Sequence, residues 1–302
     1  MQLGIFAKTF DGKKPSGVLA QVKAAGFGVA QYNMACSGLP SLPDAVGDAD
    51  VAAIAEAVKE SGVALAALSA TFNMIHPDVT VRDAGLRRLE VLARVAKTLS
   101  IPLLTLCTGT RNADDMWRHH DANTSREAWR DLVASMEKAL AIAEQHDVAL
   151  GIEPELANVV NSAAKAQQLI AEMASPRLRV VFDPANLFEE EPVEQQRRIV
   201  REGLELLADR IAIAHAKDRL PDGRFVAAGQ GVLDYPHFLR GLRNAGFDGP
   251  LITHGLAADD PVVEEKQGFE PLLSIDDQEL LRFRVFRQED RRNRKTEKRW
   301  LV

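Results

Sequence analysis

Short apolar runs alternate with longer amphipathic stretches over most of the chain. Eight apolar runs occur, at residues 3–6, 28–32, 64–68, 102–106, 149–152, 179–182, 211–214 and 250–253. Their nearly continuous apolar character is typical of strands in a parallel sheet, because both faces of such a sheet are buried. The pattern therefore predicts eight buried parallel strands.

The stretches between these runs have helical periodicity. They span residues 16–25, 51–61, 81–99, 125–146, 162–173, 193–208 and 235–245. Glycine follows several of them directly, as Gly26 and Gly246 do, and glycine is a common helix stop. Eightfold alternation of strand and helix predicts an α/β fold, a (β/α)8 TIM barrel. An open doubly wound sheet is the main competitor, but it normally has a glycine-rich turn after its first strand, which residues 7–10 lack.

The 302 residues form one predicted domain. Residues 1–256 supply the barrel strands and helices, and residues 257–302 supply a final helix, at 271–286, and a basic tail. Residues 282–299 contain nine Arg or Lys against three Asp or Glu. A solvated helix or tail is the simplest interpretation of this run, and an anion-binding or oligomer-contact role is the alternative.

Charge, hydrophobicity and cysteine spacing indicate which kinds of partner and which compartment to expect. The net charge of −6 gives no gain from counterion release on DNA or RNA, so nucleic acid is not an expected partner. No uncharged apolar stretch reaches the length of a membrane span, so a membrane is not expected either. Cys36 and Cys107 are far apart and lack metal or redox spacing, which favours reduced thiols and a cytoplasmic protein.

The ends of the strands carry the candidate chemistry, because TIM barrels place their active sites at the carboxyl ends of the strands. The first four runs end in small or neutral residues apart from Lys8. The last four are followed by Glu153, Asp183, His215 and His254. Carboxylates and imidazoles together favour one divalent metal ion, with Mn, Mg, Co and Zn as candidates. The alternative for any one of them is a polar residue that merely ends a strand.

Three further residues lie beside these candidates. Glu155 follows Glu153 by two positions and would face the same side, either as a partner of a ligand or as a solvated acid. Asn186 would bind a substrate hydroxyl or cap a helix. Lys217 would stabilise an enolate or bind a phosphate, while Asp218 would hold Lys217 or a turn.

Three loop residues are candidates for substrate binding. His76 follows the third run and would contact substrate or serve the loop structure. Trp117 offers a flat apolar surface for a sugar ring, or anchors its loop. Gln230 lies between Gly229 and Gly231, a triplet that by itself indicates a turn.

Several of these motifs together resemble the xylose-isomerase-like TIM barrels, the sugar phosphate isomerase/epimerase superfamily. The family includes ketose 3-epimerases, hydroxypyruvate isomerase, inosose dehydratase and endonuclease IV. The resemblance runs in order from about residue 1 to residue 256. It rests on Glu153-Pro154, Asp183-Pro184-Ala185-Asn186, His215-Ala216-Lys217-Asp218 and Gly229-Gln230-Gly231.

The resemblance implies a metal held by a glutamate, an aspartate, a histidine and a second glutamate. The first three correspond to Glu153, Asp183 and His215, whereas the fourth position carries His254. This departure puts a symmetric epimerase with two carboxylates in doubt. The family's common histidine three residues after the aspartate is Asn186 here, which weakens one substrate contact. Few histidines at strand ends and a negative net charge argue against an endonuclease IV-like hydrolase.

The sequence therefore predicts a metal-dependent isomerase or epimerase that transfers a proton next to a carbonyl. Its substrate would be a small sugar, a sugar phosphate or a polyol-derived ketone. Glu153 would move the proton and Lys217 would balance the charge. An inosose-type dehydratase and a non-catalytic sugar- or metal-binding barrel are the alternatives, and a homo-oligomer stays open.

Overall fold

Nine strands form the sheet in the part of the chain that the computed structural model describes, residues 1–255. Their bounds are β1 (Gln2–Phe6), β2 (Val29–Tyr32), β3 (Ala64–Ser69), β4 (Leu103–Cys107), β5 (Ala149–Glu153), β6 (Leu178–Phe182), β7 (Ile211–Arg219), β8 (Phe225–Ala227) and β9 (Pro250–Thr253). The order is β6-β5-β4-β3-β2-β1-β9-β7-β8, and β6 also pairs with β7. That last pairing closes the sheet into a barrel.

All the pairings in the barrel wall are parallel, as predicted. The eight predicted runs correspond to β1–β7 and β9. The sequence did not predict β8, which pairs antiparallel with the extended end of β7, with Lys217 opposite Ala227. This hairpin rises from the carboxyl end of β7, which is the end where the site residues lie.

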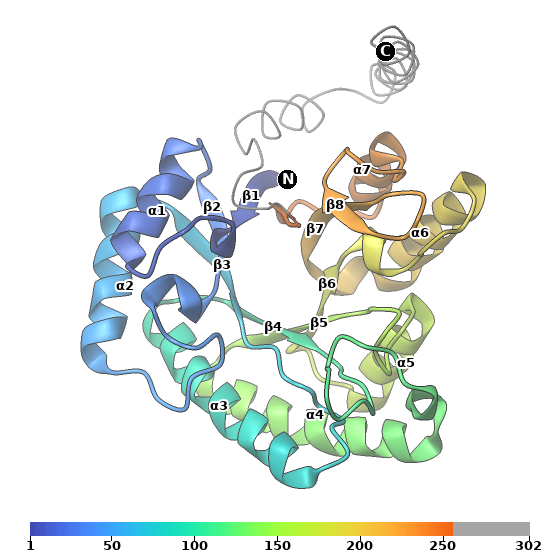
Figure 1. Cartoon of the computed structure of the whole chain (residues 1–302), viewed down its shortest axis with the longest axis horizontal. Helices are drawn as coiled ribbons and strands as arrows, with labels where there is room; N and C mark the ends of the chain where they lie inside the picture. Colours follow the sequence, from blue (N-terminus) through green and yellow to red (C-terminus); the bar gives the residue numbers. More distant parts are fainter. Residues whose placement is uncertain (256–302) are drawn as a thin grey trace, which may run out of the picture.

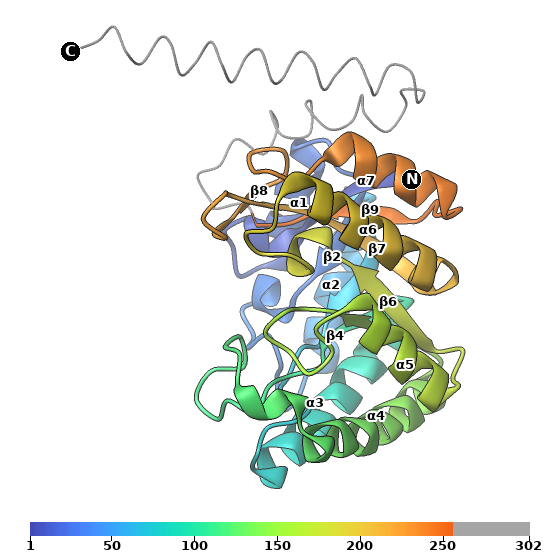
Figure 2. The same ribbon diagram turned by 90° about the vertical axis from the view of Figure 1, so that its right-hand side faces the viewer.

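Seven α-helices of the described chain surround the barrel (Figures 1 and 2). Their bounds are α1 (Pro15–Ala24), α2 (Asp48–Ser61), α3 (Val79–Thr98), α4 (Arg126–His146), α5 (Ala163–Met173), α6 (Val193–Leu207) and α7 (Tyr235–Asn244). The side chain of the N-cap residue accepts a hydrogen bond at the starts of α3, α4, α5 and α7. Ser125 accepts a hydrogen bond from the Ala128 amide and Ser162 from the Lys165 amide, so each serine is an N-cap one residue before its helix. The predicted helix at 271–286 and the basic tail lie outside the described residues.

The barrel interior is built in layers, and this layering positions the site. Its apolar layer is a cluster of side chains from five strands: Ala67, Leu103, Val181, Ile213 and Ile252. Side chains two residues apart on a strand point to the same face. The next layer of the interior therefore contains the residues two positions further toward the carboxyl ends of these strands. That layer consists of Ser69, Thr105, Asp183, His215 and His254.

None of the helices in residues 1–255 combines the length and apolar content that a membrane span requires. Cys36 and Cys107 are both buried free thiols, as the sequence predicts. The cytoplasmic location stays a prediction.

Candidate metal centre

Three predicted ligands converge at the carboxyl ends of β5, β6 and β7. Glu153, Asp183 and His215 each offer one ligand atom, and these atoms lie within 4.8 Å of one another. His215 Nδ1 is 3.3 Å from Glu153 Oε1 and 3.8 Å from Asp183 Oδ2. Since β5 pairs with β6 and β6 with β7, equivalent positions on the three strands meet at one point.

The donor atoms of this group suit a divalent ion. Asp183 Oδ2 and His215 Nδ1 are buried and make no hydrogen bond of good geometry, although a buried polar atom ordinarily makes one. Their charged neighbours are Lys217 Nζ, 3.1 Å from Asp183 Oδ2, and Glu153 Oε1, 3.3 Å from His215 Nδ1. Asp183 Oδ1 is used otherwise, because it accepts a hydrogen bond from the Ala185 amide at 2.9 Å and caps the short helix Pro184–Asn186. One carboxylate oxygen and one ring nitrogen therefore remain for a ligand, and both types of donor bind Mn, Co or Zn well.

Gln31 on β2 fixes the orientation of His215, a role that the sequence patterns do not predict. Its amide nitrogen donates to Ser69 Oγ at 3.1 Å, and Thr105 Oγ1 lies 3.5 Å away. Its carbonyl oxygen Oε1 is therefore the atom 2.8 Å from His215 Nε2, which must donate. In the neutral ring this contact places the proton on Nε2, so that Nδ1, which faces the two carboxylates, is the nitrogen that can bind a metal. The available signal was an amide inside an otherwise apolar strand.

Asn186 and Lys217 link the two carboxylates from the other side. Asn186 Nδ2 donates to Glu153 Oε1 at 2.7 Å, and Lys217 Nζ donates to Asn186 Oδ1 at 2.8 Å. Lys217 Nζ also lies 3.1 Å from Asp183 Oδ2. Asn186 thus bridges two site residues and is not the helix cap, a role that Asp183 takes. Its predicted contact with substrate stays a prediction.

Glu153 and Asp183 differ in how readily their carboxyl groups ionise. Burial opposes ionisation of Glu153, but His215 and Lys217 outweigh it and lower the pKa of Glu153 to about 2. Asp183 is more deeply buried, and burial with the repulsion of Glu153 raises its pKa despite Lys217. The Glu153 side chain retains 21% of its exposure, whereas Asp183 has none. Glu153 is therefore the ionised carboxylate with access to the mouth of the barrel.

Glu155 faces the same cluster, as its spacing predicts. Burial, and then the charge of Glu153, raise its pKa to about 7, although Lys217 opposes the shift. Asn158 Nδ2 lies 3.3 Å from Glu155 Oε2. The site thus contains a carboxyl group that holds its proton in about half of the molecules at neutral pH.

His254 is next to the cluster but is not a member of it. Its ring is stacked on the His215 ring, with centroids 5.2 Å apart, and on the Phe6 ring, with centroids 5.0 Å apart. Its Nδ1 is buried without a hydrogen-bond partner. Burial, with Lys217 as the next cause, lowers the pKa of His254 to about 3, so the ring is neutral.

The β7–β8 hairpin encloses Lys217. The Phe225 ring lies 3.9 Å from Lys217 Nζ and 3.9 Å from the guanidinium carbon of Arg219. Asp218 accepts hydrogen bonds from the amides of Gly231 and Leu233, so it holds the turn that the sequence associated with it. Gln230, in that turn, is exposed.

The remaining predicted residues lie on two loops that contact each other. His76 Nε2 is 3.1 Å from the Ala113 carbonyl oxygen, which links the β3–α3 and β4–α4 loops. Trp117, in the second loop, is 56% exposed, so its indole does not anchor the loop by burial. A contact of either side chain with substrate stays a prediction.

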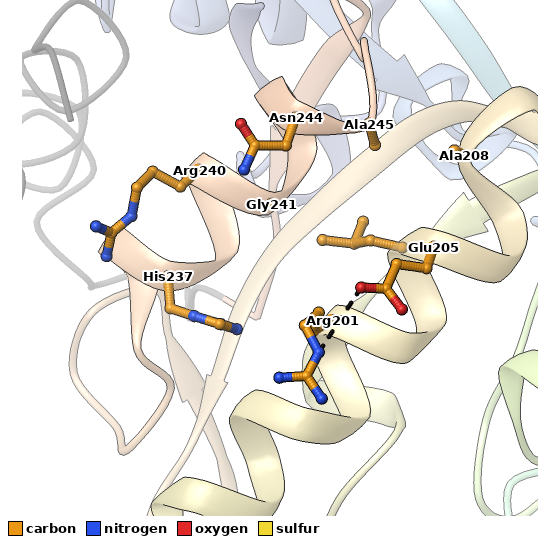
Figure 3. Close-up of a pocket in the computed structure, with 9 residues that line it drawn as sticks. Arg201, Glu205, Ala208, His237, Arg240, Gly241, Asn244 and Ala245 are labelled. Atoms are coloured by element: carbon orange, nitrogen blue, oxygen red, sulfur yellow. Dashed lines mark ion pairs between the residues drawn. The ribbon is translucent and has the colours of Figure 1, made fainter.

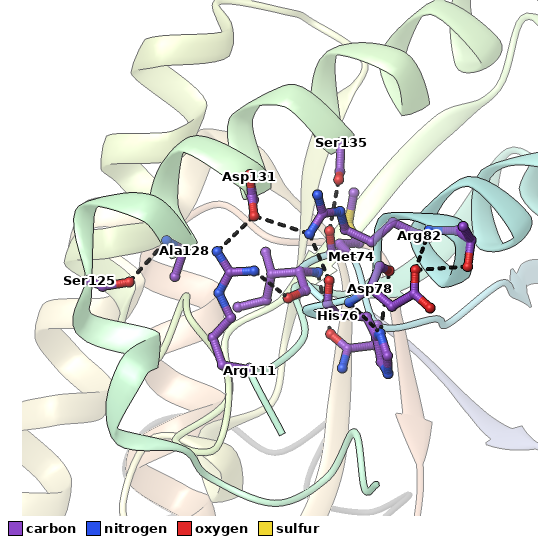
Figure 4. Close-up of polar contacts among 12 residues, drawn as sticks. Met74, His76, Asp78, Arg82, Arg111, Ser125, Ala128, Asp131 and Ser135 are labelled. Carbon is purple, nitrogen blue, oxygen red and sulfur yellow. Dashed lines mark hydrogen bonds and ion pairs between the residues drawn. The ribbon is translucent and has the colours of Figure 1, made fainter. Parts of the chain in front are cut away.

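A polar cluster behind the first loop holds its backbone (Figure 4). Asp131 on α4 accepts from Arg82 at 3.1 Å and from Arg111 at 2.7 Å. The same arginines donate to the carbonyl oxygens of His76 and Ile75. The loop that carries His76 is therefore fixed by side chains from two helices and the neighbouring loop.

A groove on the outer wall, between α6 and α7, contains none of these residues (Figure 3). Arg201, Leu204 and Glu205 line one side, and His237, Arg240 and Gly241 line the other. Arg201 and Glu205, which both line the groove, form an ion pair at 3.7 Å. The candidate chemistry of the described chain is therefore at the strand ends and not in this groove.

Comparison with solved structures identifies the same fold in two sugar epimerases and in a protein with a bound zinc atom. A 3-keto-D-glucoside 4-epimerase from E. coli is 15% identical, with 91% of this chain and 100% of that chain covered and a TM-score of 0.71. The IOLI protein with a bound zinc atom is 17% identical, with 91% and 98% covered and a TM-score of 0.71. A D-allulose 3-epimerase from Methylomonas sp., in complex with D-allulose, is 16% identical, with 90% and 96% covered and a TM-score of 0.68.

These identities are low, so the likeness shows the fold and leaves the reaction open. No curated protein sequence matches the chain. A family model described as xylose isomerase-like TIM barrel matches residues 19–274, which is most of the sequence. The chain therefore belongs to the xylose isomerase-like TIM barrel family.

Proposed function

We propose that this protein is a metal-dependent isomerase or epimerase of a small sugar, sugar phosphate or polyol-derived ketone. The observation that carries the proposal is the group Glu153, Asp183 and His215, whose ligand atoms converge at one end of the barrel. The fold is also that of solved sugar epimerases and of a protein with a bound zinc atom.

A divalent ion held by these three residues would supply Lewis-acid polarisation of a substrate carbonyl. Glu153 removes the proton from the neighbouring carbon, because it is ionised at neutral pH and has access to the mouth. Lys217, whose ammonium group lies among Asp183, Asn186 and Phe225, balances the negative charge that develops on the substrate. Return of the proton to a different carbon gives isomerisation, and return to the other face gives epimerisation.

Substrate recognition would use the loops and the residues around the ion. Trp117 would pack against a sugar ring, and His76, Gln230 and Glu155 would bind hydroxyl groups. Asn186 would contribute through its contact with Glu153. Each of these roles is part of the proposal.

A dehydratase of the inosose type is the second candidate, and Glu155 favours it. A carboxyl group with a pKa of about 7 is about half protonated at neutral pH, and its protonated form can donate the proton to a leaving hydroxide. Glu153 and Glu155 would then be the base and the acid of one elimination.

Metal analysis of purified variants tests the site directly. We expect Glu153→Gln and His215→Ala to lose bound metal, while Glu205→Gln and His119→Ala, which change exposed residues elsewhere, keep it. Full metal occupancy in both site variants would refute the ligand set. Incubation of the parent with ketoses and inososes in deuterated water then tests the reaction. Deuterium incorporation at a carbon supports an isomerase or epimerase, loss of water supports the dehydratase, and binding without either supports a non-catalytic barrel.

A further inference from the structure

We infer that His254 binds the substrate and that the metal ion has only three protein ligands. This inference rests on the proposed function, because it assigns a role within the same site. It departs from the family arrangement, in which a fourth strand end supplies a ligand.

The first argument is the position of the ring nitrogens. The ligand atoms of Glu153, Asp183 and His215 lie within 4.8 Å of one another, and neither ring nitrogen of His254 lies within 4.8 Å of all three. His254 therefore lies beside the cluster and its nitrogens do not converge with the other three ligand atoms.

The second argument is the orientation of the ring. An imidazole nitrogen binds a metal in the plane of its ring, at about 2.1 Å. The His254 and His215 rings are stacked with only 20° between their planes. The nitrogen lone pairs of two stacked rings lie in separate, nearly parallel planes and do not point at a common atom. The stacked arrangement therefore disfavours the binding of one ion by both rings.

Contacts with the first and seventh strands hold the stacked His254 ring in place. The Phe6 ring lies 5.0 Å from His254 on a plane 12° away. The His254 amide donates to the Ala216 carbonyl oxygen at 3.0 Å, which fixes the backbone beside β7. Rotation of His254 toward the ion would disrupt its contacts with both Phe6 and His215.

The third argument is the free nitrogen. His254 Nδ1 is buried and has no hydrogen-bond partner in the described chain. A buried polar group without a partner costs about 1–3 kcal/mol, so a ligand that supplies one is favoured. His254 also lies two residues after Ile252, in the layer of the barrel interior that faces the mouth. A hydroxyl or carbonyl oxygen of a sugar is a suitable partner for a neutral imidazole nitrogen.

Two variants separate the roles of ligand and substrate contact. His254→Phe keeps an aromatic ring for the stack but removes both nitrogens. His254→Asn keeps a polar group near the position of Nδ1 and provides a second variant if the first folds poorly. His215→Ala serves as the control that removes a metal ligand.

Binding of Mn²⁺ is measured by calorimetry, and binding of D-allulose and related ketohexoses to the Mn²⁺-loaded protein is measured by tryptophan fluorescence. We expect His254→Phe to bind Mn²⁺ within about twofold of the parent, whereas loss of a ligand, or of a residue that orients a ligand, would lower the affinity about 10-fold or more. We expect it to bind the sugar about tenfold more weakly, the equivalent of one buried hydrogen bond. His254→Asn should recover part of the sugar affinity.

A loss of Mn²⁺ affinity in both His254 variants that matches His215→Ala would overturn the inference, because His254 would then be a ligand. Unchanged sugar affinity in His254→Phe would overturn it as well. If the Mn²⁺-loaded parent binds none of the sugars, the proposed function and the substrate role of His254 both fail, while the Mn²⁺ measurements still decide whether His254 is a ligand.

Discussion

Replacement of Gln31 by methionine should weaken metal binding although Gln31 is not a ligand. Methionine has a similar length and keeps the buried volume, but it cannot accept the proton of His215 Nε2. Gln31 is 4% exposed, and its carbonyl oxygen is the recorded partner of that proton, at 2.8 Å. The variant therefore leaves a buried donor without a partner.

The expected loss of metal affinity follows from two free-energy costs, that of an unpaired buried N–H and that of displacing a proton from the ligand atom. An unsatisfied buried N–H costs about 1–3 kcal/mol of folding stability. His215 can avoid that cost by carrying its proton on Nδ1 instead, but Nδ1 is the nitrogen that faces Glu153 and Asp183. A metal ion would then have to displace the proton. Loss of such a partner typically lowers metal affinity 10–100-fold, or about 1.4–2.7 kcal/mol.

Calorimetric titration with Mn²⁺ and Zn²⁺ measures the affinity, and thermal unfolding with and without metal measures the stability. Thr105→Val is the matched control, because it removes a polar group in the same layer that lies 3.5 Å from Gln31 and does not touch His215. We expect this control to bind metal as the parent does. If Gln31→Met also retains the affinity of the parent, the contact does not set the orientation of His215 and the reasoning is refuted.

Two further substitutions probe the surroundings of the site. Glu155→Gln should change how the stability of the metal-free protein depends on pH. The raised pKa of Glu155 means that the folded parent holds this proton more tightly than the unfolded chain does. The free energy of unfolding of the parent therefore falls between about pH 4.5 and 7, by up to about 3 kcal/mol. Urea unfolding across this range should show a shallower fall for the variant, and identical slopes would contradict the burial of Glu155 beside Glu153. Asp131→Ala should destabilise the fold by about 3 kcal/mol, because Arg82 and Arg111 lose their shared counter-charge in a mostly buried position. Metal affinity should stay within about twofold of the parent, since the cluster of Asp131 and the two arginines holds a loop and not a ligand. A stability change below about 0.5 kcal/mol would show that the backbone contacts alone hold that loop.

The sequence predicts the barrel because each strand and helix is encoded locally, by apolar runs and helical periodicity. The three convergent ligands are predictable for the same reason: each follows an apolar run of a barrel strand, and the carboxyl ends of parallel strands meet. Glu153 ends β5, Asp183 follows β6, and His215 lies where β7 leaves the barrel wall. Gln31 was not predictable in this way, since its role depends on His215, which is 184 residues distant. His254 occupies the expected strand end, but the direction of its ring is set by packing on Phe6 from the first strand, which no local pattern records.

The sequence also gave no indication of the β7–β8 hairpin. Its second strand has only three residues, Phe225–Ala227, too few for an alternating pattern to stand out. Its pairing becomes visible only when β7 extends past the barrel wall to Arg219. Phe225, which lies against Lys217, was consequently not a candidate for the site.

Asp183 and His215 each lie two positions after an apolar interior residue, Val181 and Ile213, and this alternation also makes metal binding a measure of correct folding. A strand that paired one residue out of register would turn its ligand outward, beneath the helices, and bring a wall residue into the mouth. Such a molecule could still be compact and rich in secondary structure, yet it could not assemble Glu153, Asp183 and His215 around one point. The fraction of purified chains that takes up one equivalent of metal therefore measures the fraction whose last strands are in register, which circular dichroism alone would not distinguish.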